Sequence, residues 1–321
     1  MCSPLSPSDT ADVPSSSPRP PLDPRITEHR NPRTANIDLA TPLEIVDLMN
    51  AEDRTVADAV AAVREPVARA LGFVEEAFRS GGRLFYVGAG TSGRLGILDA
   101  SECPPTFGSD PELVQGIIAG GERAVFRSQE GAEDHPVDGA KAIDERGLGA
   151  GDVLVGIAAS GTTPFVRGAL ARARELGART VIVACTPVDD AFARSVDQAI
   201  IAVTGPEVVT GSTRLKAGTA TKMILNMLTT GAMIRTGKTY GNLMVDLCAT
   251  NLKLADRSER IVMEVCDVSR DAARALLAAA DRSVKLAIVM HATGGSADDA
   301  RAALASHGGV IRRVLAATED A

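Results

Sequence analysis

The chain has 321 residues, enough for one large domain and a smaller one, and 45% of them are hydrophobic although only 3% are aromatic. Its net charge of −7 and sequence pI near 5.3, with no run of Lys or Arg, exclude a nucleic-acid partner, because neutralising phosphates requires a basic face. No segment reaches the roughly 20 apolar residues of a membrane span, and residues 1–23 lack the apolar core of a signal peptide, so we expect a cytoplasmic protein without a membrane partner.

The cysteines predict neither a metal centre nor a disulfide framework. They are scattered, with no C-x-x-C pair and no histidine at zinc-site spacing. We interpret Cys185 and Cys248 as small buried apolar residues, and we expect no metal and no other cofactor. The five positions are Cys2, Cys103, Cys185, Cys248 and Cys266.

The N-terminal part divides into a tail and two helices. Residues 3–24 are dense in Pro and Ser, which predicts a disordered tail over residues 1–26. The motif T-P-L-E at 41–44 supplies an N-cap, a Pro at the first helical position and a Glu at the third, so a helix begins there. An Ala-rich pattern predicts a second helix over 53–79, which ends at Ser80-Gly81-Gly82.

Five apolar runs then alternate with helical patterns. Short, nearly continuous, β-branched runs separated by helices are typical of parallel strands that are buried on both faces. We therefore predict an α/β fold, a three-layer sandwich with a five-stranded parallel sheet in flavodoxin-like order, covered in part by a long helix over 216–236. The predicted strands are 84–87, 113–118, 153–158, 180–184 and 199–203.

The C-terminal part predicts a small helical domain. After Asp256 there is no convincing strand pattern, and three or four short Ala-rich helical patterns are interrupted at 293–295 and 307–309. We place a binding and catalytic domain with its N-terminal helices at 27–255 and the small helical domain at 256–321.

Two glycine- and hydroxyl-rich turns follow the first and third predicted strands. In an open α/β sheet, ligands lie beyond the carboxyl ends of the strands. There glycines let the backbone approach the ligand closely, and helix N-termini present free N–H groups to an anion. Ordinary helix capping would explain one such turn, but two favour a phosphomonoester site. Neither turn matches the dinucleotide or P-loop pattern fully. The candidate phosphate-binding residues are Gly90, Thr91, Ser92, Ser160, Gly161 and Thr162.

Two carboxylates are candidates for acid–base chemistry. Glu102 follows the first turn by about three helical turns, among apolar neighbours that would raise its pKa, and Pro104-Pro105 should end its helix there. We expect Glu102 to reach the carbon end of a bound sugar and to project over the same sheet edge as Glu133. From the residues alone, Glu130, Asp134 and His135 are alternatives to Glu133.

At these residues the sequence resembles N-acetylmuramic acid 6-phosphate etherases of the sugar-isomerase (SIS) superfamily. Shorter matches lie at 27–28, 36–38 and 249–251. The long matching blocks are G-A-G-T-S-G-R-L-G-I-L-D-A-S-E-C-P-P-T at 88–106, I-A-G-G at 118–121, E-G-A-E-D at 130–134, G-I-A-A-S-G-T-T-P at 156–164, G-P-E-V-V-T-G-S-T-R-L-K-A-G-T-A at 205–220 and G-N-L-M-V-D-L at 241–247.

The resemblance implies a reaction and the residues that carry it out. It implies cleavage of the lactyl ether to N-acetylglucosamine 6-phosphate and D-lactate, with the family's acid/base glutamate at Glu102 and its second glutamate at Glu133. Glu102 would protonate the departing lactate and then activate water, while Glu133 would handle the C2 proton or orient the reacting groups. Ser212 and Lys216 would also reach the ligand, across the interface of a homodimer.

Two other functions fit the same domain type. One is a non-catalytic sugar-phosphate sensor similar to glucokinase regulatory proteins, against which both glutamates argue. The other is a sugar-phosphate isomerase, which would also abstract a C2 proton but would release no lactate.

Overall fold

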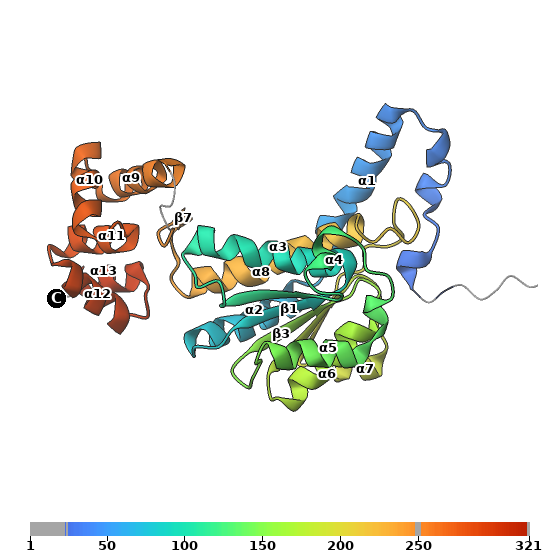
Figure 1. Ribbon diagram of the computed structural model, residues 1–321. Helices are drawn as coiled ribbons and strands as arrows, with labels where there is room; N and C mark the ends of the chain where they lie inside the picture. Colours follow the sequence, from blue (N-terminus) through green and yellow to red (C-terminus); the bar gives the residue numbers. More distant parts are fainter. Residues whose placement is uncertain (1–22, 24, 248–251, 320–321) are drawn as a thin grey trace, which may run out of the picture.

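The computed structural model describes residues 23, 25–247 and 252–319 of the chain (Figure 1). The predicted tail lies almost entirely outside this part, as do Cys2 and Cys248. The described chain begins with three short 3-10 helices, η1 (Ile26–Glu28), η2 (Pro32–Thr34) and η3 (Ile37–Leu39).

A five-stranded parallel sheet forms the centre of the molecule. Its strand order is β2-β1-β3-β4-β5, which confirms the predicted flavodoxin-like order. Each predicted strand matches an observed one to within two residues at either end. The strands are β1 (Leu84–Gly88), β2 (Val114–Ile118), β3 (Val153–Ile157), β4 (Arg179–Ala184) and β5 (Gln198–Ile201).

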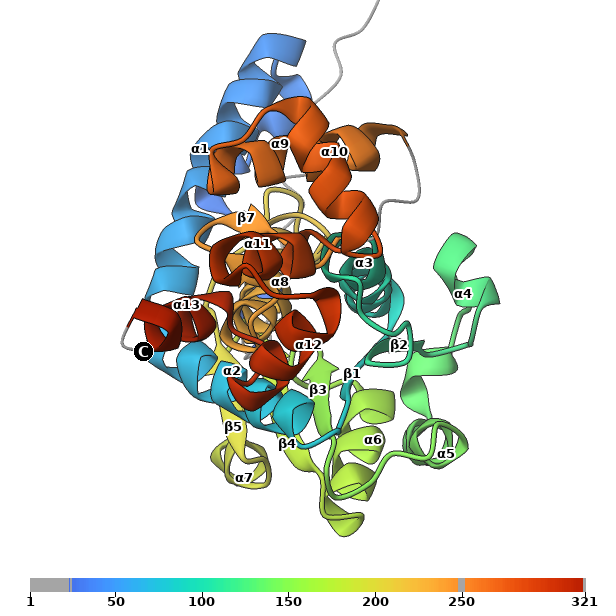
Figure 2. The same cartoon turned by 90° about the vertical axis from the view of Figure 1, so that its left-hand side faces the viewer.

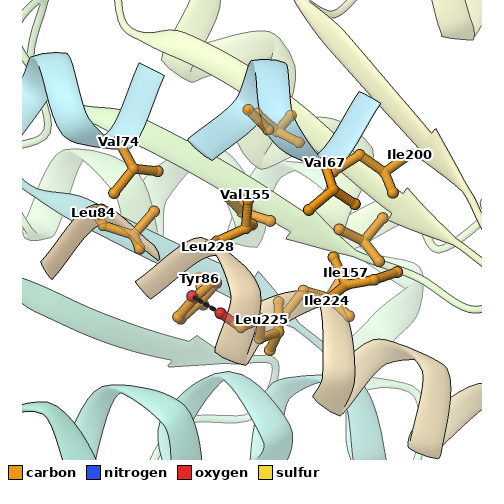
Figure 3. Close-up of a cluster of buried hydrophobic side chains, with 14 of the residues drawn as sticks. Val67, Val74, Leu84, Tyr86, Val155, Ile157, Ile200, Ile224, Leu225 and Leu228 are labelled. Carbon is orange, nitrogen blue, oxygen red and sulfur yellow. Dashed lines mark hydrogen bonds between the residues drawn. The ribbon is translucent and has the colours of Figure 1, made fainter. Parts of the chain in front are cut away.

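Both faces of the sheet are covered by helices, which makes the predicted three-layer sandwich. Side chains alternate along a strand, so Leu84 and Tyr86 of β1 face one layer while Phe85 and Val87 face the other. Figure 3 shows the first face, where α2 (Arg64–Arg79) and α8 (Lys216–Arg235) pack on the strands. The second face packs on α5 (Pro136–Glu145) and α6 (Pro164–Glu175).

The first long helix, α1 (Pro42–Ala61), begins where its cap motif predicts. The Thr41 side chain accepts the Glu44 N–H, and the Glu44 carboxylate accepts the Thr41 N–H. The predicted start of the second helix at Asp53 is wrong, because α1 continues to Ala61 and α2 begins at Arg64. Pro66 has no N–H to bond the carbonyl of Ala62, as a continuous helix would require, but it fits the first turn of a new one.

The helix that carries Glu102, α3 (Gly90–Phe107), continues past the prolines that were expected to end it. Pro104 and Pro105 lie inside its last turn, and Gly108 closes it in a left-handed conformation with its N–H on the carbonyl of Pro104 at 2.9 Å. The missing backbone bonds are tolerated because Cys103 and Phe107 are buried in the core on either side of them.

The C-terminal helices pack around a hydrophobic cluster of their own. They form a group that is joined to α8 through a short hairpin of β6 (Thr239–Tyr240) and β7 (Leu243–Met244), which the sequence did not predict (Figures 1 and 2). Both predicted interruptions are present, since Gly294 follows α11 in a left-handed conformation and Gly308 lies just beyond the end of α12. Five helices are described where three or four were predicted: α9 (Leu252–Cys266), α10 (Arg270–Ala279), α11 (Val284–Thr293), α12 (Ala297–Ser306) and α13 (Ile311–Glu319).

Three shorter elements complete the described chain. These are α4 (Arg123–Phe126), η4 (Ala132–Asp134) and α7 (Asp190–Arg194), all in connections at the edge of the sheet. Within the described ranges, the helices all fall short of the length and apolarity that crossing a membrane requires.

Candidate active site

The first glycine-rich turn joins β1 directly to α3 through close backbone packing. A Cβ on Gly88 would lie 2.6 Å from the backbone nitrogen of Gly93, and a Cβ on Gly93 would lie 2.6 Å from the Ile118 side chain. Only glycine allows this approach, which places the half-buried Thr91 and Ser92 in the first turn of α3 at the carboxyl edge of the sheet. The free N–H groups of that turn offer an anion site.

The second turn lies beside the first, because β1 and β3 are neighbours in the sheet. The Ser160 and Thr162 hydroxyls hydrogen-bond each other at 2.9 Å, and the Thr162 N–H donates to the Ser160 oxygen at 3.3 Å. Gly161 has φ +69°, and a Cβ there would overlap the Val188 side chain. The two predicted turns are therefore brought together at one sheet edge, with hydroxyls from both.

The start of α8 lies at the same edge. A Cβ on Gly218 would lie 3.7 Å from the Thr91 methyl group, so the first turns of α8 and α3 are adjacent. Ser212 is half-buried in the loop just before α8, and the carbonyl of Thr27 in η1 accepts the N–H of Gly211 at 3.1 Å. The N-terminal segment thus holds the loop that carries Ser212.

Lys216 forms a buried ion pair inside the protein. It is fully buried, and its ammonium donates to Oε2 of Glu52 in α1 at 2.7 Å. Glu52 also accepts two hydrogen bonds from the Arg33 guanidinium, and these are the main reason why the pKa of Glu52 is lowered to about 2. Lys216 lowers this pKa further, whereas burial acts to raise it. The charge of Lys216 is therefore already balanced, and this contact ties α8 to α1.

A second buried carboxylate caps α8, and no local sequence pattern predicts it. Glu207 accepts the N–H groups of Lys216 and Ala217, each at 2.9 Å, in place of a cap from the residue that precedes the helix. Burial raises the pKa of Glu207, although these backbone hydrogen bonds act in the other direction. Glu207 helps to hold the N-terminus of α8 at the sheet edge.

Glu133 lies next to the first glycine-rich turn. It is exposed in η4 and lines a hollow of about 130 Å³ together with Gly90 and Arg94. Glu130 lines the same hollow, but its carboxylate accepts a hydrogen bond from Ser128 at 3.1 Å. Within the described part of the chain, the Glu133 carboxylate forms no hydrogen bond or ion pair, so it is free to meet a ligand.

Glu102 lies at the other end of α3, and the expectation that it shares an edge with Glu133 in one chain is wrong. It is twelve positions from Gly90, which at a rise of 1.5 Å per residue is about 18 Å along the helix. It lines a different hollow, of about 430 Å³, with Asn226 of α8 and Met244 of β7. Figure 1 shows α3 running from the α4 end of the sheet toward the C-terminal helices.

Apolar residues do surround Glu102, but the expectation that they bury it is wrong in this chain, because neighbours in sequence do not share a helix face. Glu102 is exposed beside Leu98, which lies one turn earlier and is 50% exposed, whereas Cys103 points into the core. The buried acid in this region is Asp99. It accepts hydrogen bonds from Tyr86 at 2.8 Å and Asn226 at 2.6 Å, and burial raises its pKa.

A parallel sheet whose neighbouring strands end in glycine- and hydroxyl-rich turns, beside a free carboxylate, is typical of α/β proteins that bind small phosphorylated ligands. The family model of the glucokinase regulatory protein N-terminal SIS domain matches residues 67–174. The chain also superposes on phosphoheptose isomerase from Neisseria gonorrhoeae with a TM-score of 0.44 and 19% identity, over 60% of this chain and 98% of that one.

Curated relatives extend over nearly the whole chain. It is 52% identical to an N-acetylmuramic acid 6-phosphate etherase from Synechocystis sp., over 90% of this chain and 95% of the relative. It is also 52% identical to N-acetylmuramic acid 6-phosphate etherase 2 from Vibrio cholerae, over 92% of this chain and 96% of the relative. The chain therefore belongs to the N-acetylmuramic acid 6-phosphate etherase family.

Proposed function

We propose that the protein cleaves the D-lactyl ether of N-acetylmuramic acid 6-phosphate, giving N-acetylglucosamine 6-phosphate and D-lactate for the recycling of cell-wall sugars. The observation that carries this proposal is 52% identity over 90% of the chain to relatives named for that activity. The two adjacent turns and Glu133 beside them fit a phosphorylated sugar. A cytoplasmic location stays a prediction.

The chemistry follows from the position of the ether. In the open-chain sugar, the C2 proton is acidic because it is next to the aldehyde, and the lactyl oxygen on C3 is β to that aldehyde. A base removes the C2 proton, the C3–O bond breaks as lactate leaves with a proton, and water then adds at C3 while a proton returns to C2. A positioned acid or base contributes about 10²- to 10⁴-fold to such steps.

Each candidate residue has a role in this scheme. Glu133 takes the C2 proton, and Glu102 protonates the departing lactate and then activates water. The phosphate is held by the two turns, with Ser212 close by. Lys216 does not contact the ligand in this scheme; its ion pair with Glu52 holds the start of α8 in place. The phosphate-binding residues are Gly90, Thr91, Ser92, Ser160, Gly161 and Thr162.

The position of Glu102 supports a homodimer. A glutamate about 18 Å along α3 from the phosphate turn does not reach C3 of a sugar held there in the same chain. A second copy would bring its Glu102 to the first copy's turns. Two apolar side chains near Glu102 are exposed as an interface would require, namely Leu98 at 50%, one turn earlier on α3, and Ile234 at 50%, which lines the same hollow.

Release of D-lactate tests the function directly. The protein is incubated with N-acetylmuramic acid 6-phosphate in D₂O, and we expect stoichiometric D-lactate together with deuterium at C2 of the product. Glu102→Ala and Glu133→Ala should each lower kcat by about 10² or more. Asp134→Ala is the matched control, because it removes an exposed carboxylate next to Glu133. Activity near that of the wild type in either glutamate variant would remove that residue from the mechanism.

The same incubation tests the sensor, which the matching family model favours as a second candidate. A sensor would bind sugar phosphates and leave the substrate intact, and an isomerase would change the sugar without releasing lactate. Binding without D-lactate would therefore overturn the proposed activity.

A further inference from the structure

Arg94 forms two main-chain contacts that the reaction scheme does not use. It lies on α3 just after the first turn, two residues after Ser92. Its Nε donates to the carbonyl of Val125 and its Nη2 to the carbonyl of Ala124, both at 2.8 Å. Both carbonyls belong to α4, a helix too short to satisfy them itself. A planar guanidinium can meet two such acceptors at once, which an ammonium cannot do with the same geometry.

The segment that α4 begins is the one that carries Glu133. Only six residues lie between Phe126 and Glu133, and Arg94 lines the same hollow as Glu133. The segment has a second attachment where Gln129 packs on Gly120, at which a Cβ would lie 2.9 Å from that of Gln129. Hydrophobic burial at α4 is limited to the small side chain of Ala124, because Phe126 is 88% exposed.

We infer that Arg94 is a positioning residue that sets the Glu133 carboxylate relative to the phosphate-binding turn. One end of its side chain belongs to the helix turn that carries Thr91 and Ser92, and the other holds the segment that carries the base. A sugar held by its phosphate then presents C2 at a defined distance from Glu133. This inference rests on the proposed function. A misplacement of about 1 Å costs on the order of 10²-fold in rate.

The test compares Arg94→Ala and Arg94→Lys with Arg123→Ala in the full-length protein. Arg123 is exposed in the same segment, and its side chain forms no ion pair or hydrogen bond with the described residues, so this control removes a cation without removing the contact. For both Arg94 variants we expect kcat for lactate release to fall about 10²-fold, with the same fall in C2 deuterium exchange. The Kd of the product N-acetylglucosamine 6-phosphate should stay within about threefold, since the phosphate turn is kept. Added guanidinium ion should restore part of the activity of Arg94→Ala.

Amide hydrogen exchange supplies a readout that does not depend on activity. Residues 121–135 should exchange faster in both Arg94 variants, while the sheet stays protected as in the wild type. If kcat stays within about threefold of the wild type, or if the Kd of the product rises as much as kcat falls, the positioning role is refuted. An unchanged exchange rate over 121–135 refutes it as well, even if the wild type releases no lactate. Absence of lactate from the wild type would instead refute the proposed function alone.

Discussion

Mixing two inactive variants tests whether the active site is shared between two chains. Glu102→Ala removes the acid from α3, and Glu133→Ala removes the base from η4. Each homodimer should be about 10²- to 10⁴-fold slower than the wild type, because every site lacks one group. A dimer that contains one chain of each kind differs from both. One of its sites combines the intact Glu133 of one chain with the intact Glu102 of the other, and the second site lacks both.

The size of the recovery follows from the separation of the two glutamates. Since about 18 Å of helix lies between Glu102 and the turn beside Glu133, the two meet only between chains, and each mixed dimer has one working site of two. Random reassociation makes about half of all dimers mixed, so the mixture should reach about a quarter of wild-type activity. Each parent alone should stay inactive.

The assay is D-lactate release after the two variants are dissociated together and refolded, with mixed dimers counted by native mass spectrometry of differently tagged chains. The control is Glu102→Ala mixed with the variant that carries both Glu102→Ala and Glu133→Ala, because no pairing of these chains restores a complete site. If mixed dimers are present and activity does not rise above that of the parents, the two-chain site is wrong. Recovery in the control would show that the assay does not report complete sites.

Three further predictions concern stability. Lys216→Met should lower the free energy of unfolding by about 3 kcal/mol, the low end for a buried ion pair that loses one partner, because Arg33 still contacts Glu52. Urea unfolding measures this loss. Adding Glu52→Gln should recover part of it, because the unpaired buried charge is then removed. Burial raises the pKa of Asp99, so the folded state favours the protonated acid, and its stability should fall as pH rises from the unfolded pKa near 4 through the folded one. Asp99→Asn should lack this fall, and a difference from the wild type that is the same at every pH would contradict the assignment. Gly161→Ala should cost about 1–3 kcal/mol and lower Tm more than Gly147→Ala, which has a similar positive φ but open space around it; equal losses would show that the overlap with the neighbouring valine is absent.

Local patterns were enough to predict most of the sheet and the edge at which the candidate site lies. The strands buried on both faces have a nearly continuous apolar sequence, and their order followed from alternation with helices. The start of α1 was predicted from Thr41, Pro42 and Glu44 because a cap forms between residues that are close in sequence. The two turns were recognisable from their glycines, because glycine is needed where the backbone packs too closely on neighbouring atoms to leave room for a Cβ.

The remaining features depend on contacts between distant residues, and only the tertiary structure decided them. The partner of Lys216 is 164 positions away in the chain, and the cap of α8 comes from Glu207 rather than from the residue before the helix. Helix α3 passes two prolines because buried side chains around them hold it in place. The same unbroken helix carries Glu102 away from Glu133, since a helix extends by 1.5 Å per residue whatever chemistry its side chains serve. The sequence by itself therefore determined the fold and the sheet edge at which the candidate site lies, and the three-dimensional structure decided which groups can meet within one chain.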